Sequence, residues 1–232
     1  MALDRSLISG LPPFAGLDAP ALDSILSQAR SLRFPKDAEI FTQDGEAEHF
    51  FLLLSGHVRV VRTTPGGDQV IARYINEGEL LGIAVAMGRT TYPASAVAAV
   101  DCIVLAWPNI VWPRLQARHP AFGVNAYQAL GARLEETQAR VVEMSTQQVE
   151  QRIASAVLRL VTQSGRKTPD GIEIDFPISR QDIAEMTGST LHTVSRLLSA
   201  WEDEGIVLSR RQKVVVTDPH ALMLVAENRR RK

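Results

Sequence analysis

The sequence predicts an α+β fold in which a β sandwich or barrel is followed by a long helix and a winged helix-turn-helix. Short apolar or alternating runs succeed one another from Glu39 to Trp107, separated by glycines, and such a series is typical of an all-β domain. Apolar residues at helical spacing follow over residues 120–148. Two short helices joined by a glycine turn, and then a basic hairpin, complete the pattern.

The 232-residue chain has the composition of an ordinary globular protein. Hydrophobic residues make up 45% of it and charged residues 22%, which is enough apolar material to form packed cores. No apolar run approaches the roughly 18 residues that span a bilayer, and the N-terminal sequence MALDRSLISG lacks the apolar segment of a signal peptide. We therefore expect a cytoplasmic protein without a membrane partner.

Charge is divided unevenly along the chain, although the net charge is only −1. Residues 1–150 hold 12 Lys or Arg against 16 Asp or Glu, whereas residues 151–232 hold 13 against 10. A basic C-terminal part favours a polyanionic partner. The terminal run Arg229-Arg230-Arg231-Lys232 is expected to be a solvated tail.

The N-terminal part is predicted to contain one helix and a series of strands. From Leu17 to Arg33 the apolar residues share one helical face, with Asp18 as the expected N-cap and Pro20 in the first turn. The expected strands are the runs EIFTQ, HFFLLL, HVRVVRT, QVIARYI, SAVAAV and CIVLAW. The single cysteine, Cys102, is expected to be a buried small side chain in the last run. One thiol excludes an internal disulfide, and also a zinc finger or iron–sulfur cluster within one chain.

A long helix from about Pro120 to Gln148 carries an apolar seam at spacings of three and four. The seam consists of Tyr127, Leu130, Leu134, Thr137, Val141, Met144 and Gln148. This heptad pattern is that of a two-stranded coiled coil, so we expect the helix to join two copies in a homodimer. The alternative is an amphipathic helix that packs on its own domain. A second helix is expected from Val149 to Val161, and residues 163–171 form a turn-rich stretch.

Residues 178–207 predict two helices joined by a tight turn. Gly188 can take the left-handed backbone that ends the first helix, and Thr190 can cap the second. The expected core side chains of the two helices are Ile183, Ala184, Met186, Val194, Leu197, Leu198 and Trp201. His192, Ser195 and Arg196 then share a solvent-facing side, which is the geometry of a recognition helix in the major groove. The arginine fork can donate to guanine O6 and N7 at once.

A basic β-hairpin is predicted after the second helix. Its strands are GIVLS and KVVVT, and RRQ forms the turn between them. The side chains expected to meet DNA phosphates as a wing are Arg210, Arg211 and Lys213. Ser179, Arg180 and Thr190, at the starts of the two helices, are the remaining candidate DNA contacts.

The chain resembles the CRP/FNR family of bacterial transcriptional regulators over nearly its whole length. Gly45, Gly56, Gly78 and Gly82 fall where that family's cyclic-nucleotide-binding-like β-roll, a jelly roll, keeps glycines. The stretch SRQDIAEMTGSTLHTVSRLL resembles the family's helix-turn-helix throughout. The domains implied are an effector-sensing β-roll over residues 1–118, a dimerisation helix over 119–148 and a winged helix-turn-helix DNA-binding domain over 149–232.

The resemblance also implies binding partners and the bases that the recognition helix contacts. The partners are double-stranded DNA with an inverted repeat of the TTG…CAA type, and RNA polymerase. Ser195 and Arg196 match the FNR-type E-x-x-S-R signature, but His192 stands in place of the glutamate. We therefore expect the base next to the guanine to differ from that of an FNR site.

Four residues of an effector pocket follow from the same resemblance. Cyclic-AMP-binding members hold the ribose and the cyclic phosphate with a glycine-glutamate pair and an arginine-serine pair, where this chain has Gly82-Ile83 and Tyr92-Pro93. A phenol and a proline ring remove the cation and a backbone N–H that a phosphate needs. Cyclic AMP is therefore not expected to bind. The four-cysteine iron–sulfur cluster of the FNR branch cannot form with one cysteine.

Among the branches that lack both signatures, the chain looks most like the nitric-oxide-responsive regulators of the NnrR and DNR type. This likeness implies an activator of denitrification genes that responds to nitric oxide or nitrogen oxides, with haem as a cofactor. The candidate haem ligands are His49 and His57, although no spacing singles out either. The alternative is a CRP/FNR-type regulator of other stress or anaerobic genes, with no effector or one that is not a cyclic nucleotide.

Two other classes of function account for less of the sequence. A cupin-like metal enzyme needs two or three histidines and a carboxylate at close spacing, whereas His49 and His57 stand apart. A ligand-binding module without DNA binding would leave Arg196 and the basic wing unexplained. We therefore expect a protein that is not an enzyme.

Overall fold

The computed structural model describes residues 4–229, which pack as two units. One unit contains the residues up to Gly66 together with Arg73–Thr137, and the other contains Gly67–Ala72 and the residues from Gln138 on. The division falls inside the longest helix, α3, which runs from Pro120 to Thr146. The basic tail expected at residues 229–232 lies, beyond Arg229, outside the described residues.

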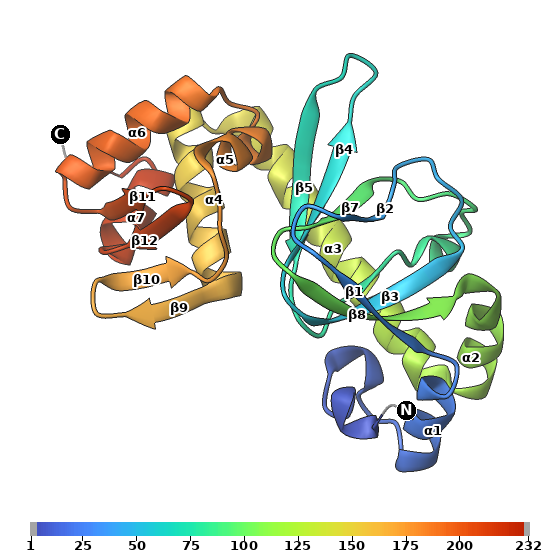
Figure 1. Ribbon diagram of the computed structural model, residues 1–232. Helices are drawn as coiled ribbons and strands as arrows, with labels where there is room; N and C mark the ends of the chain where they lie inside the picture. The colour runs from blue at the N-terminus through green and yellow to red at the C-terminus, as the bar shows by residue number, and fades with distance from the viewer. Residues whose placement is uncertain (1–3, 230–232) are drawn as a thin grey trace. The chain divides into compact units, whose positions relative to one another are not determined.

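The first unit is a β-roll of two four-stranded sheets, in the orders β1-β8-β3-β6 and β2-β7-β4-β5 (Figure 1). The strands are β1 Arg30–Phe34, β2 Glu39–Phe41, β3 His49–Ser55, β4 Val58–Thr63, β5 Gln69–Ile75, β6 Leu80–Leu81, β7 Ser95–Ala98 and β8 Cys102–Pro108. The residues of β5 up to Ala72 belong to the other unit. The helices beside them are α1 Ala19–Leu26, α2 Trp112–Arg118 and the first part of α3. Each of the six runs predicted to be strands contains one, so the predicted fold class is confirmed. Cys102 is buried, as expected.

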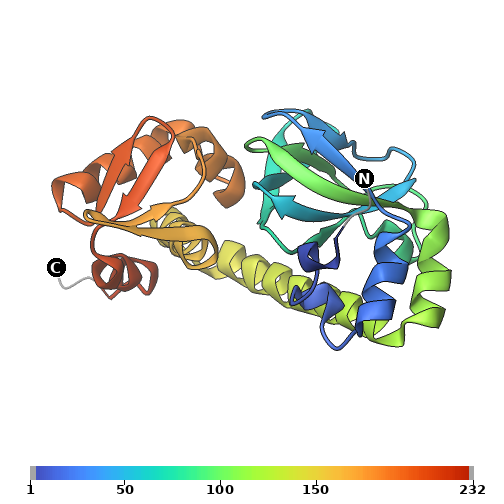
Figure 2. The same ribbon diagram turned by 60° about the horizontal axis from the view of Figure 1, so that its bottom comes forward.

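β3 shows why an uninterrupted apolar run forms a strand in this fold. Phe50 and Leu52 belong to the core that the sheet shares with the helices, whereas Phe51 and Leu53 belong to the core between the two sheets. A strand that is covered on both faces needs apolar residues at every position. Figure 2 shows α1 and α2 beside the first part of α3. These helices cover the core that they share with β3.

The predicted helix from Leu17 to Arg33 is wrong in its second half. The helix is capped by Asp18, whose carboxylate accepts the backbone N–H of Ala21 at 2.9 Å, but it ends at Leu26. Residues from Arg30 on form β1, which pairs antiparallel with β8. Local periodicity could not anticipate this strand because its partner lies far along the chain, and strand formation depends on such tertiary pairing. The helix α2 and the short strand β6 were likewise not predicted.

The second unit is a helix-turn-helix on a four-stranded sheet of order β11-β12-β10-β9 (Figure 1). Its elements are α4 Val149–Ser164, β9 Gly165–Thr168, β10 Gly171–Ile174, α5 Arg180–Thr187, α6 Leu191–Asp203, β11 Val207–Arg210, β12 Lys213–Val216 and α7 Pro219–Ala226. The second helix, α4, is confirmed, as is the wing hairpin of β11 and β12. The stretch over residues 163–171, predicted to be rich in turns, forms the end of α4, the strand β9 and the turn into β10, and β10 pairs with both β9 and β12.

The helix α6 is held against α4 by the largest side chain of its buried face. Trp201 is fully buried, and its indole Nε1 donates to the carboxylate of Glu150 at 3.2 Å. An indole N–H that is buried without a partner would cost about 1–3 kcal/mol, so this hydrogen bond helps to fix the orientation of α6. Among the described helices, none is both long and apolar enough to cross a membrane.

Candidate nucleic-acid interface and effector pocket

The turn between α5 and α6 is fixed by caps at the helix ends. The backbone N–H of Asp182 donates to the Ser179 hydroxyl at 3.0 Å, and the Asp182 carboxylate accepts the N–H of Ser179 at 2.7 Å. Gly188 ends α5 with φ 59° and ψ 41°, a left-handed conformation that favours glycine. The Thr190 hydroxyl accepts the N–H of Thr193 at 3.2 Å and starts α6. The conformational roles predicted for Gly188 and Thr190 are therefore confirmed.

The helix α6 has one buried face and one exposed face. Its buried side chains are Val194, Leu198 and Trp201, with Leu197 half-buried beside them. His192 and Arg196 are exposed, and Ser195 is partly exposed between them. The structure therefore brings the three predicted base-reading residues together on the first turns of α6, where they can reach a ligand from solvent.

Sequence reasoning missed Leu191, the first residue of α6. This leucine is 49% exposed beside His192. Apolar side chains in the major groove can contact the methyl group of thymine, so Leu191 belongs to the candidate reading face. The signal that could have indicated Leu191 is an apolar residue at the first position of a predicted recognition helix.

A groove of about 350 Å³ lies between the starts of α5 and α6 and the wing. Its lining residues are Ile178, Ser179, Arg180, Gln181, Leu191, Ser209, Arg210, Arg211, Gln212 and Val214. Arg180 is oriented here by a hydrogen bond from its guanidinium to the Ser209 hydroxyl at 3.3 Å. Four predicted DNA contacts, Ser179, Arg180, Arg210 and Arg211, therefore meet in one place. Three guanidinium groups around a groove suit the binding of phosphate oxygens.

Lys213, the third predicted wing cation, is not among the residues that line this groove. Its ammonium lies 3.3 Å from the carboxylate of Glu173, which also pairs with Arg166 at 3.0 Å. Part of the Lys213 charge is thus balanced within the sheet, although the side chain is largely exposed and such surface pairs are weak.

The seam of α3 is exposed over much of its length. The exposed fractions are 45% for Tyr127, 59% for Leu134, 61% for Val141 and 43% for Met144, and Thr137 is also exposed. Leu130 packs partly against the core of its own unit, as do the buried residues Phe122 and Ala126. The first turns of α3 therefore follow the alternative of packing on their own domain, and the later turns leave their apolar side chains partly or largely exposed. Gln148, expected as the last seam residue, is outside α3 and caps α4 instead.

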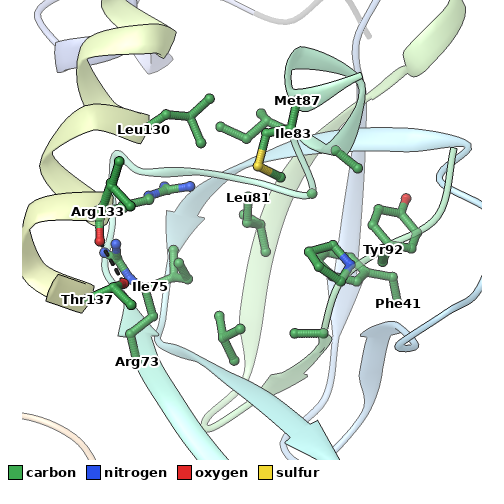
Figure 3. A pocket seen from close by; sticks show the side chains of 16 residues that line it. Phe41, Arg73, Ile75, Leu81, Ile83, Met87, Tyr92, Leu130, Arg133 and Thr137 are labelled. Atoms are coloured by element: carbon green, nitrogen blue, oxygen red, sulfur yellow. Dashed lines mark hydrogen bonds between the residues drawn. The ribbon is translucent and has the colours of Figure 1, made fainter. Parts of the chain in front are cut away.

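The four predicted effector-site residues line one pocket of the first unit, with a volume of about 330 Å³. Its lining residues are Phe41, Val60, Arg73, Ile75, Leu81, Gly82, Ile83, Ala84, Met87, Tyr92, Pro93, Ala94, Leu130, Arg133, Leu134 and Thr137. Figure 3 shows α3 with Leu130, Arg133 and Thr137 on one side and the stacked rings of Phe41 and Tyr92 on the other.

Tyr92 cannot replace the cation that a cyclic phosphate requires. Its hydroxyl donates to the carbonyl oxygen of His49 at 2.7 Å, and its ring stacks on Phe41 with the centroids 4.0 Å apart. Burial raises the pKa of the Tyr92 phenol above its ordinary value, so the group stays protonated. Ile83 and Pro93 complete this side of the pocket without a charge or a side-chain donor.

Sequence reasoning also missed two arginines in the pocket wall. Arg73 lies 2.5 Å from the carboxylate of Glu79 and 3.7 Å from that of Glu136. Arg133 lies 3.6 Å from Glu79 and donates to the carbonyl oxygen of Leu80. Burial, followed by the nearby charge of Arg73, lowers the pKa of Arg133, and Glu79 opposes the shift. The two cations thus form a network with two carboxylates that bridges β5, β6 and α3.

The two candidate haem ligands, His49 and His57, lie at different places in the β-roll, with different polar neighbours. His49 lies with its Nε2 3.4 Å from the Arg30 guanidinium, and His57 lies with its Nδ1 3.1 Å from the side-chain oxygen of Asn76. Neither histidine lines the pocket. Within residues 4–229, no group of three or more His, Cys, Asp or Glu side chains is placed to hold a metal ion.

Comparisons with known proteins agree with both halves of this description. Residues 31–119 match the model of the cyclic nucleotide-binding domain, and residues 151–225 match that of the Crp-like helix-turn-helix domain. The cyclic AMP receptor protein of Thermus thermophilus is 31% identical over 200 residues, which cover 86% of this chain and 89% of that protein. The chain belongs to the CRP/FNR family. Regulators of this family bind DNA and act as dimers, and this CRP/FNR chain is accordingly a DNA-binding transcriptional regulator.

One further relative is named as a regulation protein, and one solved structure shares the fold. The nitrogen fixation regulation protein FixK of Azorhizobium caulinodans is 27% identical over 191 residues, covering 82% of this chain and 76% of that protein. The structure of FixK2 from Bradyrhizobium japonicum superposes with a TM-score of 0.75 at 21% identity, covering 85% of this chain and 96% of that one, which shows the shared fold.

Proposed function

We propose that this CRP/FNR regulator is a homodimeric activator that binds an inverted repeat of the TTG…CAA type in double-stranded DNA and contacts RNA polymerase. The observation that carries the proposal is the exposed start of α6, where His192, Ser195 and Arg196 share one face. The basic groove of Arg180, Arg210 and Arg211 lies beside that face and would hold the DNA backbone. The two recognition helices of a dimer then read half-sites centred about 34 Å apart.

The proposal is tested by fluorescence anisotropy with two duplexes of equal length at physiological salt. One duplex carries the TTG…CAA repeat, and the other carries the same bases in scrambled order. Specific sites bind at least about a thousandfold more tightly than non-specific DNA, so we expect a difference of that order. Equal affinity for the two duplexes would show that the chain does not recognise this repeat.

His192 is expected to change the base that is read next to the guanine. A carboxylate accepts a hydrogen bond from cytosine N4, and an imidazole ring at this exposed position does not reproduce that contact. His192→Glu should therefore shift the half-site preference toward that of an FNR site. Selection from random DNA with the wild type and the variant checks this, and identical half-sites would mean that His192 contacts no base.

Cyclic AMP is expected neither to bind nor to activate. Ile83, Tyr92 and Pro93 offer its phosphate no cation and no side-chain donor, and the carboxylates of Glu79 and Glu136 already hold the arginines of the wall. Isothermal titration calorimetry should show no heat of binding, and the affinity for the repeat should not change with added nucleotide. A micromolar dissociation constant would refute this description of the pocket.

The narrower form of the proposal is a response to nitric oxide or nitrogen oxides that controls denitrification genes. It is supported by the resemblance to NnrR and DNR regulators and by a relative named for the regulation of nitrogen fixation. Expression from a promoter with the repeat should rise when nitric oxide is supplied, and an unchanged output would contradict it. The apolar pocket favours the alternative of another effector that is not a cyclic nucleotide.

Haem held by His49 or His57 is not part of this proposal, because both side chains lie outside the pocket. The absorption spectrum of anaerobically purified protein, recorded with and without nitric oxide, tests the haem question separately. We expect no haem band that depends on either histidine, so His49→Ala and His57→Ala should leave the spectrum unchanged.

A further inference from the structure

The pocket between the β-roll and α3 is lined almost entirely by apolar groups. Its walls include Ile75, Leu81, Ile83, Met87 and Leu130, side chains that come from β5, β6, the following loop and α3. Ligand pockets of this kind are mostly apolar, with a few placed polar groups that set the orientation. A molecule that enters this one gives up contact with water and gains contact with hydrocarbon.

The charges in the wall balance without a ligand. Within the described part of the chain, Arg73 and Arg133 are the charged side chains that line the pocket. Arg73 contacts Glu79 at 2.5 Å, and the second guanidinium donates to a backbone carbonyl and also faces Glu79 at 3.6 Å. Glu136 faces Arg73 at 3.7 Å, so two carboxylates match two guanidinium groups. An anion in the pocket would have to compete with these carboxylates while losing its own hydration, which is costly in an apolar site.

We propose that the effector of this regulator is an uncharged, largely apolar small molecule, aromatic or aliphatic, that fills this pocket. The inference rests on the proposed function in that it names the ligand class of the same regulator. A cavity of about 150 Å³ binds benzene, so a pocket of about 330 Å³ takes a molecule of two or three rings or an equivalent chain.

The position of the pocket allows such a ligand to affect the dimer. Leu134 and Thr137 line the pocket and are also members of the seam of α3. A ligand that packs against Leu130 and Leu134 therefore contacts the helix that is proposed to join the two copies. Its binding can shift the population of dimers that are competent to bind DNA, by as much as its affinities for the two states differ.

Two dyes that share an anilinonaphthalene body provide the test. N-phenyl-1-naphthylamine is uncharged, and 8-anilinonaphthalene-1-sulfonate carries a sulfonate on nearly the same rings. With the full-length wild type we expect saturable fluorescence of the uncharged dye at one molecule per chain, and binding of the sulfonate at least tenfold weaker. Equal or tighter binding of the sulfonate, or no saturable binding of the uncharged dye, would overturn the inference.

A matched pair of variants locates the dye. Met87 lines the pocket and is 46% exposed, so Met87→Lys should leave the fold intact, weaken the uncharged dye at least tenfold and improve the sulfonate. Met223 is 40% exposed on α7 of the second unit and is not a lining residue of the pocket, so Met223→Lys should change neither affinity. An equal effect of both variants would show that the dye binds elsewhere.

The same preparations separate this inference from the proposed function. If the wild type binds the repeat but no uncharged dye, the ligand class is wrong and the DNA-binding function stands. If the dye binds only a monomeric variant such as Val141→Lys, a second copy of the chain closes the pocket and the inference also fails. If the wild type does not bind the repeat, the proposed function is wrong, whether or not the uncharged dye binds.

Discussion

Leu134→Lys is expected to turn the dimer into monomers that no longer bind the inverted repeat. Leu134 is 59% exposed in the middle of the α3 seam, and in a dimer each copy would bury it. Burial of such a side chain is worth about 1.5–3 kcal/mol, so two copies lose about 3–6 kcal/mol, or roughly two to four orders of magnitude in the dimer dissociation constant. Analytical ultracentrifugation over a range of concentrations measures this constant directly.

Neighbouring residues on α3 provide the control for this result. Val141 and Val142 are 61% and 60% exposed, but only Val141 belongs to the seam. Val141→Lys should therefore dissociate the dimer as Leu134→Lys does, without touching the pocket that Leu134 also lines. Val142→Lys should leave the dimer and its DNA binding unchanged. A dimer that survives both seam variants would mean that α3 is not the interface.

Arg196→Ala should cost about 1–3 kcal/mol at each half-site, and therefore about 2–6 kcal/mol for the dimer on the full repeat. The guanidinium is exposed on the reading face of α6, where its fork can donate to O6 and N7 of the half-site guanine. Affinity for the repeat should fall roughly thirtyfold or more, whereas affinity for scrambled DNA should fall little. Replacing the guanine in the duplex should lower the binding free energy of the wild type by the same amount as Arg196→Ala does. The binding free energy of the variant should hardly change.

Arg211→Ala is the matched control, because it also removes one exposed arginine from the same unit. Arg211 lines the groove at the wing, where it is expected to meet phosphate. Its loss should weaken the repeat and the scrambled duplex by similar factors, and it should lower the salt dependence by about one unit of slope per lost contact. An Arg196→Ala variant that behaves in this way would place Arg196 on the DNA backbone rather than on a base.

The sequence patterns predicted most of the DNA-binding unit because its decisive features are local. Gly188 and Thr190 act within a few residues of their own positions, as a left-handed turn and a cap. The face of α6 follows from helical geometry alone once its start is known. The β9–β10 hairpin was missed because it depends on tertiary pairing: β10 also pairs with β12, which comes much later in the chain.

The effector pocket was predicted only in part for the same physical reason. Gly82 and Tyr92 came from the resemblance, whereas Arg73 and Arg133 became visible only when β5 and α3 were brought together. Charged residues on an amphipathic helix are ordinarily solvated, so nothing in the sequence distinguished Arg133 from Arg140 or Glu135. The ion-pair partners of a buried guanidinium depend on tertiary structure.

Two copies of this chain are proposed to read an inverted repeat with the exposed face of α6. Selection of binding sites from random double-stranded DNA by the wild-type protein measures this recognition. We expect a symmetric site with two guanine-containing half-sites centred one helical turn apart, about 34 Å. Selection of a single unpaired half-site, or of no sequence at all, would contradict it.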